Sequence, residues 1–212
     1  MFDTDHTLVL LAGAPGTGKT YTSKIIKESF PKLIDMPLDL FKEHIYDEIG
    51  FDNVSQKNML DEEARQRFYR ALDIMMSWEK PMIGDYPFSY KQKPHIRKLA
   101  EKYRYNVITV RLEADVNTLY ERQRKRDVDE DRHPGHLMNH YHLGDVITYK
   151  SQADGMPSFE TFKDRMEDRG YADFAIGSLI RIDVSDYSKI DYDSLIDQLH
   201  TYIDTQKSVE EF

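Results

Sequence analysis

A single stretch, residues 13–20, constrains the fold of this chain more than any other part of its sequence. It reads Gly-Ala-Pro-Gly-Thr-Gly-Lys-Thr, follows the apolar run 8–12, and precedes a helical pattern. Glycines let backbone N–H groups approach an anion closely, and the positive N-terminus of a following helix attracts that anion. A plain glycine turn between a strand and a helix is the alternative. We favour a phosphate-binding loop, because all fixed positions of the G-x-x-x-x-G-K-[ST] pattern are present in the right context.

The loop residues have separate expected tasks. Lys19 should reach the β and γ phosphates of a nucleotide, and the Thr20 hydroxyl should bind Mg²⁺. The other residues should surround the phosphates, namely Gly13, Ala14, Pro15, Gly16, Thr17 and Gly18. The stretch resembles the Walker A motif of the P-loop NTPase superfamily, and this resemblance implies nucleotide binding.

The composition narrows the remaining choices. At 212 residues the chain is long enough for one domain, 1–212. Its 29 lysines and arginines against 38 aspartates and glutamates give a net charge of -9, which argues against a nonspecific nucleic-acid or anionic-membrane surface and leaves a local basic groove open. The absence of cysteine excludes disulfides, thiolate metal sites and a cysteine nucleophile, and it fits a reducing compartment.

The sequence shows no pattern typical of a membrane segment. Residues 1–5 are acidic and lack the basic and apolar regions of a signal peptide, and no apolar run is long enough to cross a bilayer. We therefore expect a soluble, cytoplasmic protein. The polar tail from about residue 205 to 212 is expected to be disordered.

Apolar patterns predict five strands that alternate with helices. The strand patterns cover residues 8–12, 32–39, 81–85, 107–112 and 179–184. Helical spacing of apolar residues follows the first four strands and closes the chain after the fifth. The stretch 127–177 interrupts this order, with one expected helix at 159–169. The alternation predicts an α/β fold whose parallel sheet is covered on both faces.

Ligands of such sheets bind beyond the carboxyl ends of the strands, which here selects four loops: 13–20, 37–43, 85–90 and 185–187. Asp39 follows the second strand, so it should face the phosphate loop. A carboxylate at this place could orient an attacking hydroxyl and accept its proton during phosphoryl transfer. Capping of the following helix is the alternative, since aspartate is favoured at helix N-termini. We favour the catalytic role.

The third strand also ends in an aspartate. Asp85 follows two apolar residues and a glycine, and it could hold Mg²⁺ directly or through water, or contact the substrate. A turn residue before Pro87 is the alternative. Aromatic side chains come next, and Phe88 belongs either to the wall of a substrate pocket or to the core.

Arginines gather after the fourth strand. Arg122 and Arg126 are four residues apart on one helix, so they share a face, and Arg132 follows an acidic loop. Arginines that close over a nucleotide neutralise the charge that develops on the transferred phosphoryl group. A solvated, salt-bridged helix end is the alternative. We favour a lid over about 122–177 that carries these arginines.

Histidines crowd the start of this lid. His133, His136, His140 and His142 make up half of the 8 histidines in the chain. The four-residue spacing of His136 and His140 leaves a metal site open, but neither a zinc-protease glutamate nor a cysteine accompanies them. We favour lid or substrate contacts for His133 and His136.

The assembled order of loop, strand-end aspartates and arginine lid resembles the P-loop kinase group. Over about residues 7–203 the layout is similar to zeta-toxin and chloramphenicol-phosphotransferase type small kinases and to nucleoside kinases, and the whole pattern resembles a bacterial branch of AAA-type predicted kinases. The resemblance implies a three-layer α/β/α fold with sheet order 2-3-1-4-5 and a long lid. It places the catalytic aspartate at Asp39 and the lid arginines at Arg122 and Arg126. It places the adenine near Arg122, Val184, Ser185, Asp186 and Tyr187.

We therefore expect an ATP- and Mg²⁺-dependent phosphotransferase that acts on a hydroxyl of a small molecule, such as a nucleoside, sugar nucleotide or antibiotic. In this hypothesis Arg126 stabilises the transition state, with Arg122 and Arg132 as lid partners. One alternative is a nucleotide-dependent binding switch or ATPase without an acceptor. Another is a toxin-like kinase of cell-wall precursors.

Overall fold

The computed structural model describes residues 6–129, 131–147 and 149–205. Residues 1–5, which are acidic and lack a signal-peptide pattern, lie outside these ranges. The tail 206–212, for which the sequence predicts disorder, also lies outside them. None of the helices within them is both long and apolar enough to cross a membrane.

Five parallel strands form the centre of the fold, as the sequence predicts. They are β1 (Thr7–Ala12), β2 (Ile34–Asp35), β3 (Met82–Asp85), β4 (Asn106–Glu113) and β5 (Ser178–Asp183). Their order is β2-β3-β1-β4-β5, and every pair of neighbours is parallel. This confirms the expected sheet, and it brings all the carboxyl ends to one edge.

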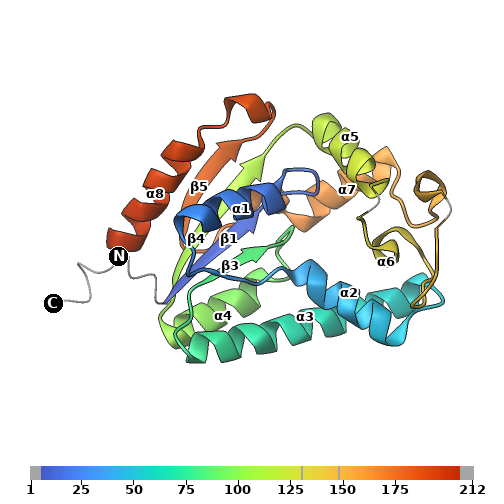
Figure 1. Ribbon diagram of the computed structural model, residues 1–212, viewed down its shortest axis with the longest axis horizontal. Coiled ribbons are helices and arrows are strands. Elements are labelled where there is room, and N and C mark those ends of the chain that lie inside the picture. Colours follow the sequence, from blue (N-terminus) through green and yellow to red (C-terminus); the bar gives the residue numbers. More distant parts are fainter. Residues whose placement is uncertain (1–5, 130, 148, 206–212) are drawn as a thin grey trace.

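Helices cover both faces of the sheet and give the predicted three layers (Figure 1). α1 (Lys19–Ser29) and α8 (Tyr192–Thr205) pack on one face, while α3 (Val54–Ser77) and α4 (Lys93–Tyr103) pack on the other. Successive residues of β1 serve opposite faces: Leu8 and Leu10 join the cluster under α3 and α4, and Val9 and Leu11 join the one under α1 and α8. A strand buried on both faces must be apolar throughout, which explains the run 8–12.

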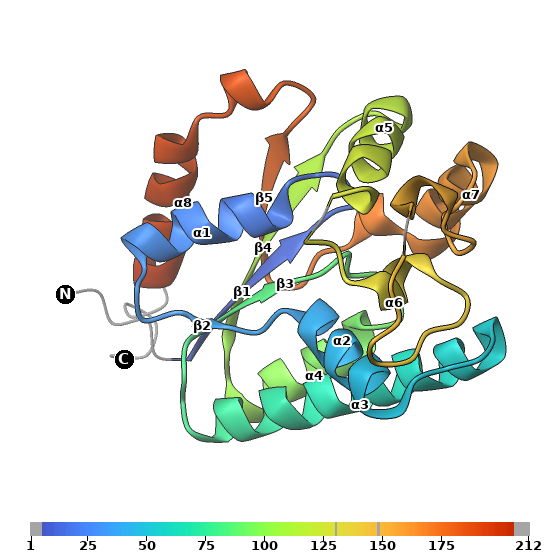
Figure 2. The ribbon, with the colours of Figure 1, turned by 45° about the vertical axis from the view of Figure 1, so that its right-hand side comes forward.

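The predicted lid lies over the carboxyl ends of the strands (Figure 2). α5 (Val116–Asp127) leads into it, and the four-residue α6 (Pro134–Leu137) and α7 (Phe159–Arg169) follow. The helix expected at 159–169 is therefore confirmed. Phe162 of α7 packs against Leu119 of α5 and Ala14 of the phosphate loop, so the lid and the loop share one apolar cluster.

The second strand and the helix after it differ from the prediction. The extended stretch expected over 32–39 contains only the two strand residues of β2, and α2 (Leu38–Ile49) begins directly after Pro37. Proline has a fixed φ and no N–H to place in a strand ladder, so it ends the extended stretch early. Asp39 consequently lies in the first turn of α2.

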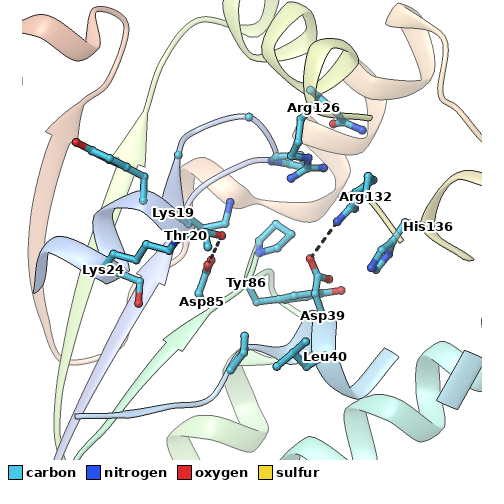
Figure 3. A pocket seen from close by; sticks show the side chains of 18 of the residues that line it. Lys19, Thr20, Lys24, Asp39, Leu40, Asp85, Tyr86, Arg126, Arg132 and His136 are labelled. Atoms are coloured by element: carbon cyan, nitrogen blue, oxygen red, sulfur yellow. Dashed lines mark hydrogen bonds and ion pairs between the residues drawn. The ribbon is translucent and has the colours of Figure 1, made fainter. Parts of the chain in front are cut away.

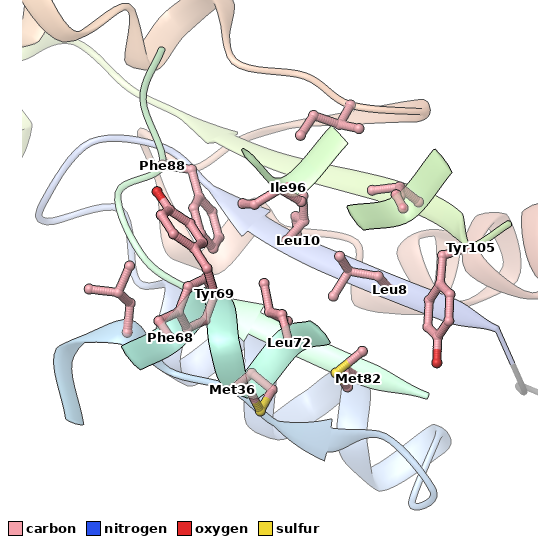
Figure 4. Close-up of a cluster of buried hydrophobic side chains, with 14 of the residues drawn as sticks. Leu8, Leu10, Met36, Phe68, Tyr69, Leu72, Met82, Phe88, Ile96 and Tyr105 are labelled. Atoms are coloured by element: carbon pink, nitrogen blue, oxygen red, sulfur yellow. The ribbon is translucent and has the colours of Figure 1, made fainter. Parts of the chain in front are cut away.

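Phe88 belongs to the core and not to a pocket wall (Figure 4). Its side chain is fully buried, its ring stacks on Phe174 with 5.5 Å between centroids, and Phe68 lies 6.4 Å away. Of the two roles that the sequence leaves open, the structure selects the core, because the turn after β3 folds this ring back under α3.

Replacing Phe88 should therefore reduce stability without changing the cleft. We expect Phe88→Ala to lower the free energy of unfolding by about 3–5 kcal/mol, because it removes a large buried ring and leaves a cavity. Urea unfolding followed by circular dichroism measures the change. Tyr90→Ala, two residues further on and 57% exposed, is the control and should change stability by less than about 0.5 kcal/mol. Equal values for the two variants would contradict the core position.

Candidate active site

The phosphate loop has a backbone that only glycine allows at three positions. Gly13, Gly16 and Gly18 have φ values of 128°, 87° and 83°. A Cβ atom on Gly13 would lie 2.4 Å from the carbonyl oxygen of Leu112, and one on Gly16 would lie 2.5 Å from that of Leu119. Both the left-handed backbone and the close approach to β4 and α5 explain the spacing of these glycines.

Lys19 begins α1 and turns its side chain back under the loop. Its Nζ donates hydrogen bonds to the carbonyl oxygens of Gly13 at 3.0 Å and Ala14 at 2.9 Å. Burial lowers the pKa of Lys19 from 10.5 to about 8, against the opposing attraction of Asp85 and Asp39, and the charge of Arg126 lowers it further. Those three side chains are therefore close enough to act on the ammonium, as Figure 3 shows.

Thr20 and Asp85 form a hydroxyl–carboxylate pair beside this lysine. The Thr20 Oγ1 donates to Asp85 Oδ2 at 2.7 Å. Burial raises the pKa of Asp85 above its ordinary value, although Lys19 and the Thr20 hydroxyl oppose the shift. Both oxygens suit Mg²⁺, which commonly binds one or two protein ligands together with phosphate oxygens and water. The predicted metal ligands are thus brought together.

Asp39 faces the same cleft from the first turn of α2. Its Oδ2 lies 3.9 Å from Arg132 Nη1 (Figure 3). The helix N-cap is Pro37, without a side-chain capping hydrogen bond, so the capping alternative for Asp39 is wrong. The carboxylate is free to point into the cleft.

The predicted adenine side of the site is also assembled. Arg122 stacks on the ring of Tyr187 at 3.9 Å, and its guanidinium donates to the carbonyl oxygens of Val184 at 2.6 Å and Ser185 at 2.9 Å. The Tyr187 hydroxyl in turn donates to the Gly16 carbonyl oxygen at 3.0 Å. The helix α5, the loop after β5 and the phosphate loop are therefore fixed to one another at this point.

Arg126 and Arg132 lie over the cleft on either side of a buried acid. Asp127, only 3% exposed, has its Oδ1 3.3 Å from Arg126 Nη2 and 3.7 Å from Arg132 Nε. A salt bridge is thus present at this helix end, but it forms around a buried acid and not at a solvated helix end. Both arginines line the cleft.

These groups line one cleft of about 1330 Å³. Nine lysines and arginines line it against six aspartates and glutamates, although the whole chain has a net charge of -9. Its walls include most of the predicted site residues: Lys19, Thr20, Asp39, Asp85, Arg122, Arg126, Arg132, His136 and Tyr187. A basic cleft in an acidic protein concentrates anionic ligands.

Six predicted site residues do not line this cleft, and three of them belong to the phosphate loop: Gly13, Ala14 and Thr17. The other three lie elsewhere. Phe88 is in the core, His133 contacts α2 through Asp47, and Ser185 takes part through its backbone oxygen. The histidines do not converge on a metal: His136 bonds to Glu43 and His140 lies near Asp154. Among the described residues, no group of three or more histidines and acids is placed to hold a metal ion.

The sequence reasoning also missed residues that line the cleft. Lys42 and Glu43 follow Asp39 on α2, Tyr86 follows Asp85, and Arg165 reaches in from α7. The first three lie in the strand-end loops that the sequence singled out, so they could have been found. Arg165 carries no such signal, since only the folding of the lid brings α7 to the cleft.

Comparison with known proteins agrees with this fold. The model of the Zeta toxin family matches residues 3–143. No curated protein matches the chain at a significant level. A solved structure described as a "putative kinase", from Chloroflexus aurantiacus J-10-fl, is 20% identical, with a TM-score of 0.72 over 94% of this chain and 99% of the other.

Two further solved structures are similar in fold. A gluconokinase from Sinorhizobium meliloti 1021 is 12% identical, with a TM-score of 0.54 over 97% of this chain and 96% of the other. A sugar kinase from Janibacter sp. HTCC2649 is 16% identical, with a TM-score of 0.51 over 93% and 94%. At these identities the likeness shows a shared fold.

The lowered pKa of Lys19 predicts how nucleotide binding to the loop depends on pH. A triphosphate favours the ammonium form, which the free protein loses as the pH rises through about 8. The affinity for a nucleoside triphosphate should therefore be level below about pH 8 and should fall by about tenfold per pH unit well above it. Equilibrium binding of an analogue with a nonhydrolysable γ-phosphate measures this.

Lys19→Met is the control for the pH profile. It should bind the analogue weakly, with no break near pH 8, because the titrating group is gone. A break that persists in this variant would assign the titration to another residue and contradict the role given to Lys19.

Proposed function

The chain belongs to the Zeta toxin family, and from this premise we propose that it is an ATP- and Mg²⁺-dependent phosphotransferase acting on a hydroxyl of a small molecule. One observation carries the proposal: Asp39, Lys19 and Arg126 line one basic cleft, and the charges of Asp39 and Arg126 both act on the Lys19 ammonium. A general base, a phosphate-binding ammonium and a transition-state cation are the parts that phosphoryl transfer needs.

The donor half of the cleft fits ATP. The loop presents backbone N–H groups and the N-terminus of α1 to the phosphates, and Lys19 supplies the charge. The Arg122–Tyr187 stack offers a planar surface for the base. When bound, Mg²⁺ would be held by Thr20 and Asp85 and would neutralise charge on the β and γ phosphates.

The acceptor half begins at Asp39. The acceptor oxygen attacks the γ-phosphorus, the bond from that phosphorus to the β–γ bridging oxygen breaks, and ADP leaves. Asp39 takes the hydroxyl proton, and Arg126 stabilises the charge that develops on the phosphoryl group in the transition state. Lys42, Arg132 and Arg165 also line the cleft, which favours an acceptor that itself carries negative charge, such as a sugar nucleotide.

The base assignment is tested by Asp39→Asn. We expect transfer from labelled ATP to fall by about 100-fold or more in single turnover, because the amide cannot accept the proton. The affinity for ATP should stay within about twofold, since the loop is untouched. Acceptors are first found by a thermal-shift screen with a nonhydrolysable ATP analogue and Mg²⁺.

Asp73→Asn is the matched control, because Asp73 of α3 does not line the cleft and pairs with Lys102 of α4 at 2.8 Å. It should transfer at the wild-type rate. Near wild-type transfer by Asp39→Asn would contradict the assignment of Asp39 as the general base. An acceptor screen that yields only slow ATP hydrolysis would instead favour a nucleotide-dependent switch.

Arg126 should contribute to the rate and little to binding. Arg126→Ala is expected to lower kcat by about 100-fold with a small change in the KM for ATP, because the guanidinium interacts most strongly with the transition state. Steady-state kinetics on the acceptor from the screen give both constants. A raised KM with unchanged kcat would show that Arg126 binds the ground state and the transition state equally, and would contradict the role given to it.

A toxin-like kinase remains a second candidate, favoured by the family to which residues 3–143 match. Expression in a bacterial host should then arrest growth, and Lys19→Ala should restore it, because the variant cannot hold the donor phosphates. Colony counts after induction decide between the two. Growth arrest that survives Lys19→Ala would separate toxicity from phosphoryl transfer.

A further inference from the structure

The stretch Arg-His-Pro-Gly-His at 132–136 is not explained by the proposed reaction alone. Only its first and last residues line the cleft. Opposite it, α2 carries Asp39, Glu43 and Asp47 at intervals of four residues. Residues four apart share one face of a helix. A row of acidic side chains on α2 therefore faces the arginine and the histidines of residues 132–136.

Each of these three acids has a partner in the lid segment. Asp39 pairs with Arg132 at 3.9 Å, Glu43 with His136 Nε2 at 2.8 Å, and Asp47 with His133 Nε2 at 3.1 Å. The pair nearest the phosphate loop is the longest, and the pair farthest from it is much shorter. The lid is thus held tightly at its outer end and loosely where the chemistry is proposed.

His133 makes two hydrogen bonds that together fix its tautomer. Its Nδ1 accepts from the backbone N–H of Gly135 at 3.0 Å, so this nitrogen carries no proton. Its Nε2 therefore carries the proton of the neutral ring and donates to Asp47 Oδ1. One imidazole ring both caps the turn that begins α6 and attaches that turn to α2.

The two residues after His133 let the turn approach α2. Pro134 starts α6, where its missing N–H costs nothing. A Cβ atom on Gly135 would lie 2.6 Å from Cδ2 of the buried Tyr46 ring and 3.1 Å from the His133 ring. Glycine is therefore required for the turn to pack on α2.

The outer end of the segment is fixed independently. The Tyr141 hydroxyl donates to the same Asp47 oxygen at 2.6 Å. Backbone hydrogen bonds of 2.7 Å in both directions join Tyr141 to Phe51 after α2. Although burial opposes it, the bonds from Tyr141 and His133 lower the pKa of Asp47 below its ordinary value, so the acid stays ionised and in place.

Arg132, in contrast, is not held by its own side chain. Its Nε is buried without a hydrogen-bond partner among the described residues, and its two ion pairs, with Asp39 and Asp127, are 3.9 and 3.7 Å long. Such long contacts leave the guanidinium free to shift. Its position must therefore depend on where the adjoining backbone is anchored.

We propose that residues 132–136 form a clip in which His133, docked on Asp47, positions Arg132 against Asp39. His133 is a positioning residue, since it does not line the cleft and acts through Arg132. This role deepens the proposed phosphoryl transfer and rests on it: the clip keeps the arginine beside the base and the acceptor. A displacement of about 1 Å at such a site can cost up to about 100-fold in rate.

The test compares two substitutions of His133. His133→Asn keeps an acceptor for the Gly135 N–H but is too short to reach Asp47, whereas His133→Gln keeps a donor that can reach Asp47. We expect kcat to fall by about 10- to 100-fold in His133→Asn and to recover partly in His133→Gln, with the KM for ATP unchanged in both. His142→Ala is the control, since it removes a comparable bond, of 2.9 Å to Asp52, that lies on the surface.

A double-mutant cycle shows whether the effect passes through Arg132. In the Arg132→Ala background, His133→Asn should cost nothing further, because the group that it positions is gone. Additive losses would overturn the clip and leave His133 a general stabiliser of the lid. If His133→Asn does not fold, Asp47→Ala takes its place in the cycle. Because Asp47→Ala also removes the bond from Tyr141, Tyr141→Phe, which removes that bond alone, is measured beside it.

Hydrogen exchange separates this inference from the proposed function. The amides of His136 and Met138, bonded to the carbonyl oxygens of His133 and Pro134, should exchange at least about tenfold faster in His133→Asn than in wild type and His142→Ala. A wild-type protein that transfers no phosphoryl group would refute the proposed function. The amide exchange rates would then be the measurement that tests whether His133 holds the lid segment on Asp47. Unchanged exchange, or full activity of His133→Asn in an active protein, would overturn the clip.

Discussion

A buried ammonium must be surrounded by oxygen atoms, and the arrangement of this fold around Lys19 follows from that requirement. The loop supplies two carbonyl oxygens, which it can do only because Gly13, Gly16 and Gly18 turn the backbone through left-handed conformations. β3 and α2 supply the carboxylates of Asp85 and Asp39. Three segments far apart in sequence thus meet at one cation, and the parallel sheet brings them there because its carboxyl ends share one edge.

The charge at this edge of the sheet differs from the charge of the whole chain. The chain is acidic overall, yet the cleft at the strand ends is basic. An acidic surface repels nucleic acids and anionic membranes, while a local basic cleft attracts small anions. Both halves of the proposed transfer site benefit, since the donor is a polyanion and the lid cations extend beyond Asp39. Asp127 lies within ion-pair distance of two of these cations, Arg126 and Arg132.

Much of this was predictable from sequence, because the decisive signals are local. The loop, the strand β1 and the helix at Phe159–Arg169 each follow from residues that are adjacent in the chain. The early start of α2 was missed, since a helix can begin wherever a proline ends an extended stretch. The burial of Phe88 was left open, because only packing against Phe68 and Phe174 decides it. The pairing of His133 with Asp47 joins residues 86 positions apart, so no local pattern reveals it.

The central claim is that a donor phosphate on the loop and a base on α2 serve a single reaction in one cleft. The most direct measurement is a crystal structure of the chain with ADP, Mg²⁺ and aluminium fluoride, which mimics the planar phosphoryl group of the transition state. The account predicts that the fluoride contacts Lys19 and Arg126 and that its open side faces Asp39. A fluoride that binds with its open side turned away from Asp39, or a nucleotide bound outside residues 13–20, would contradict it.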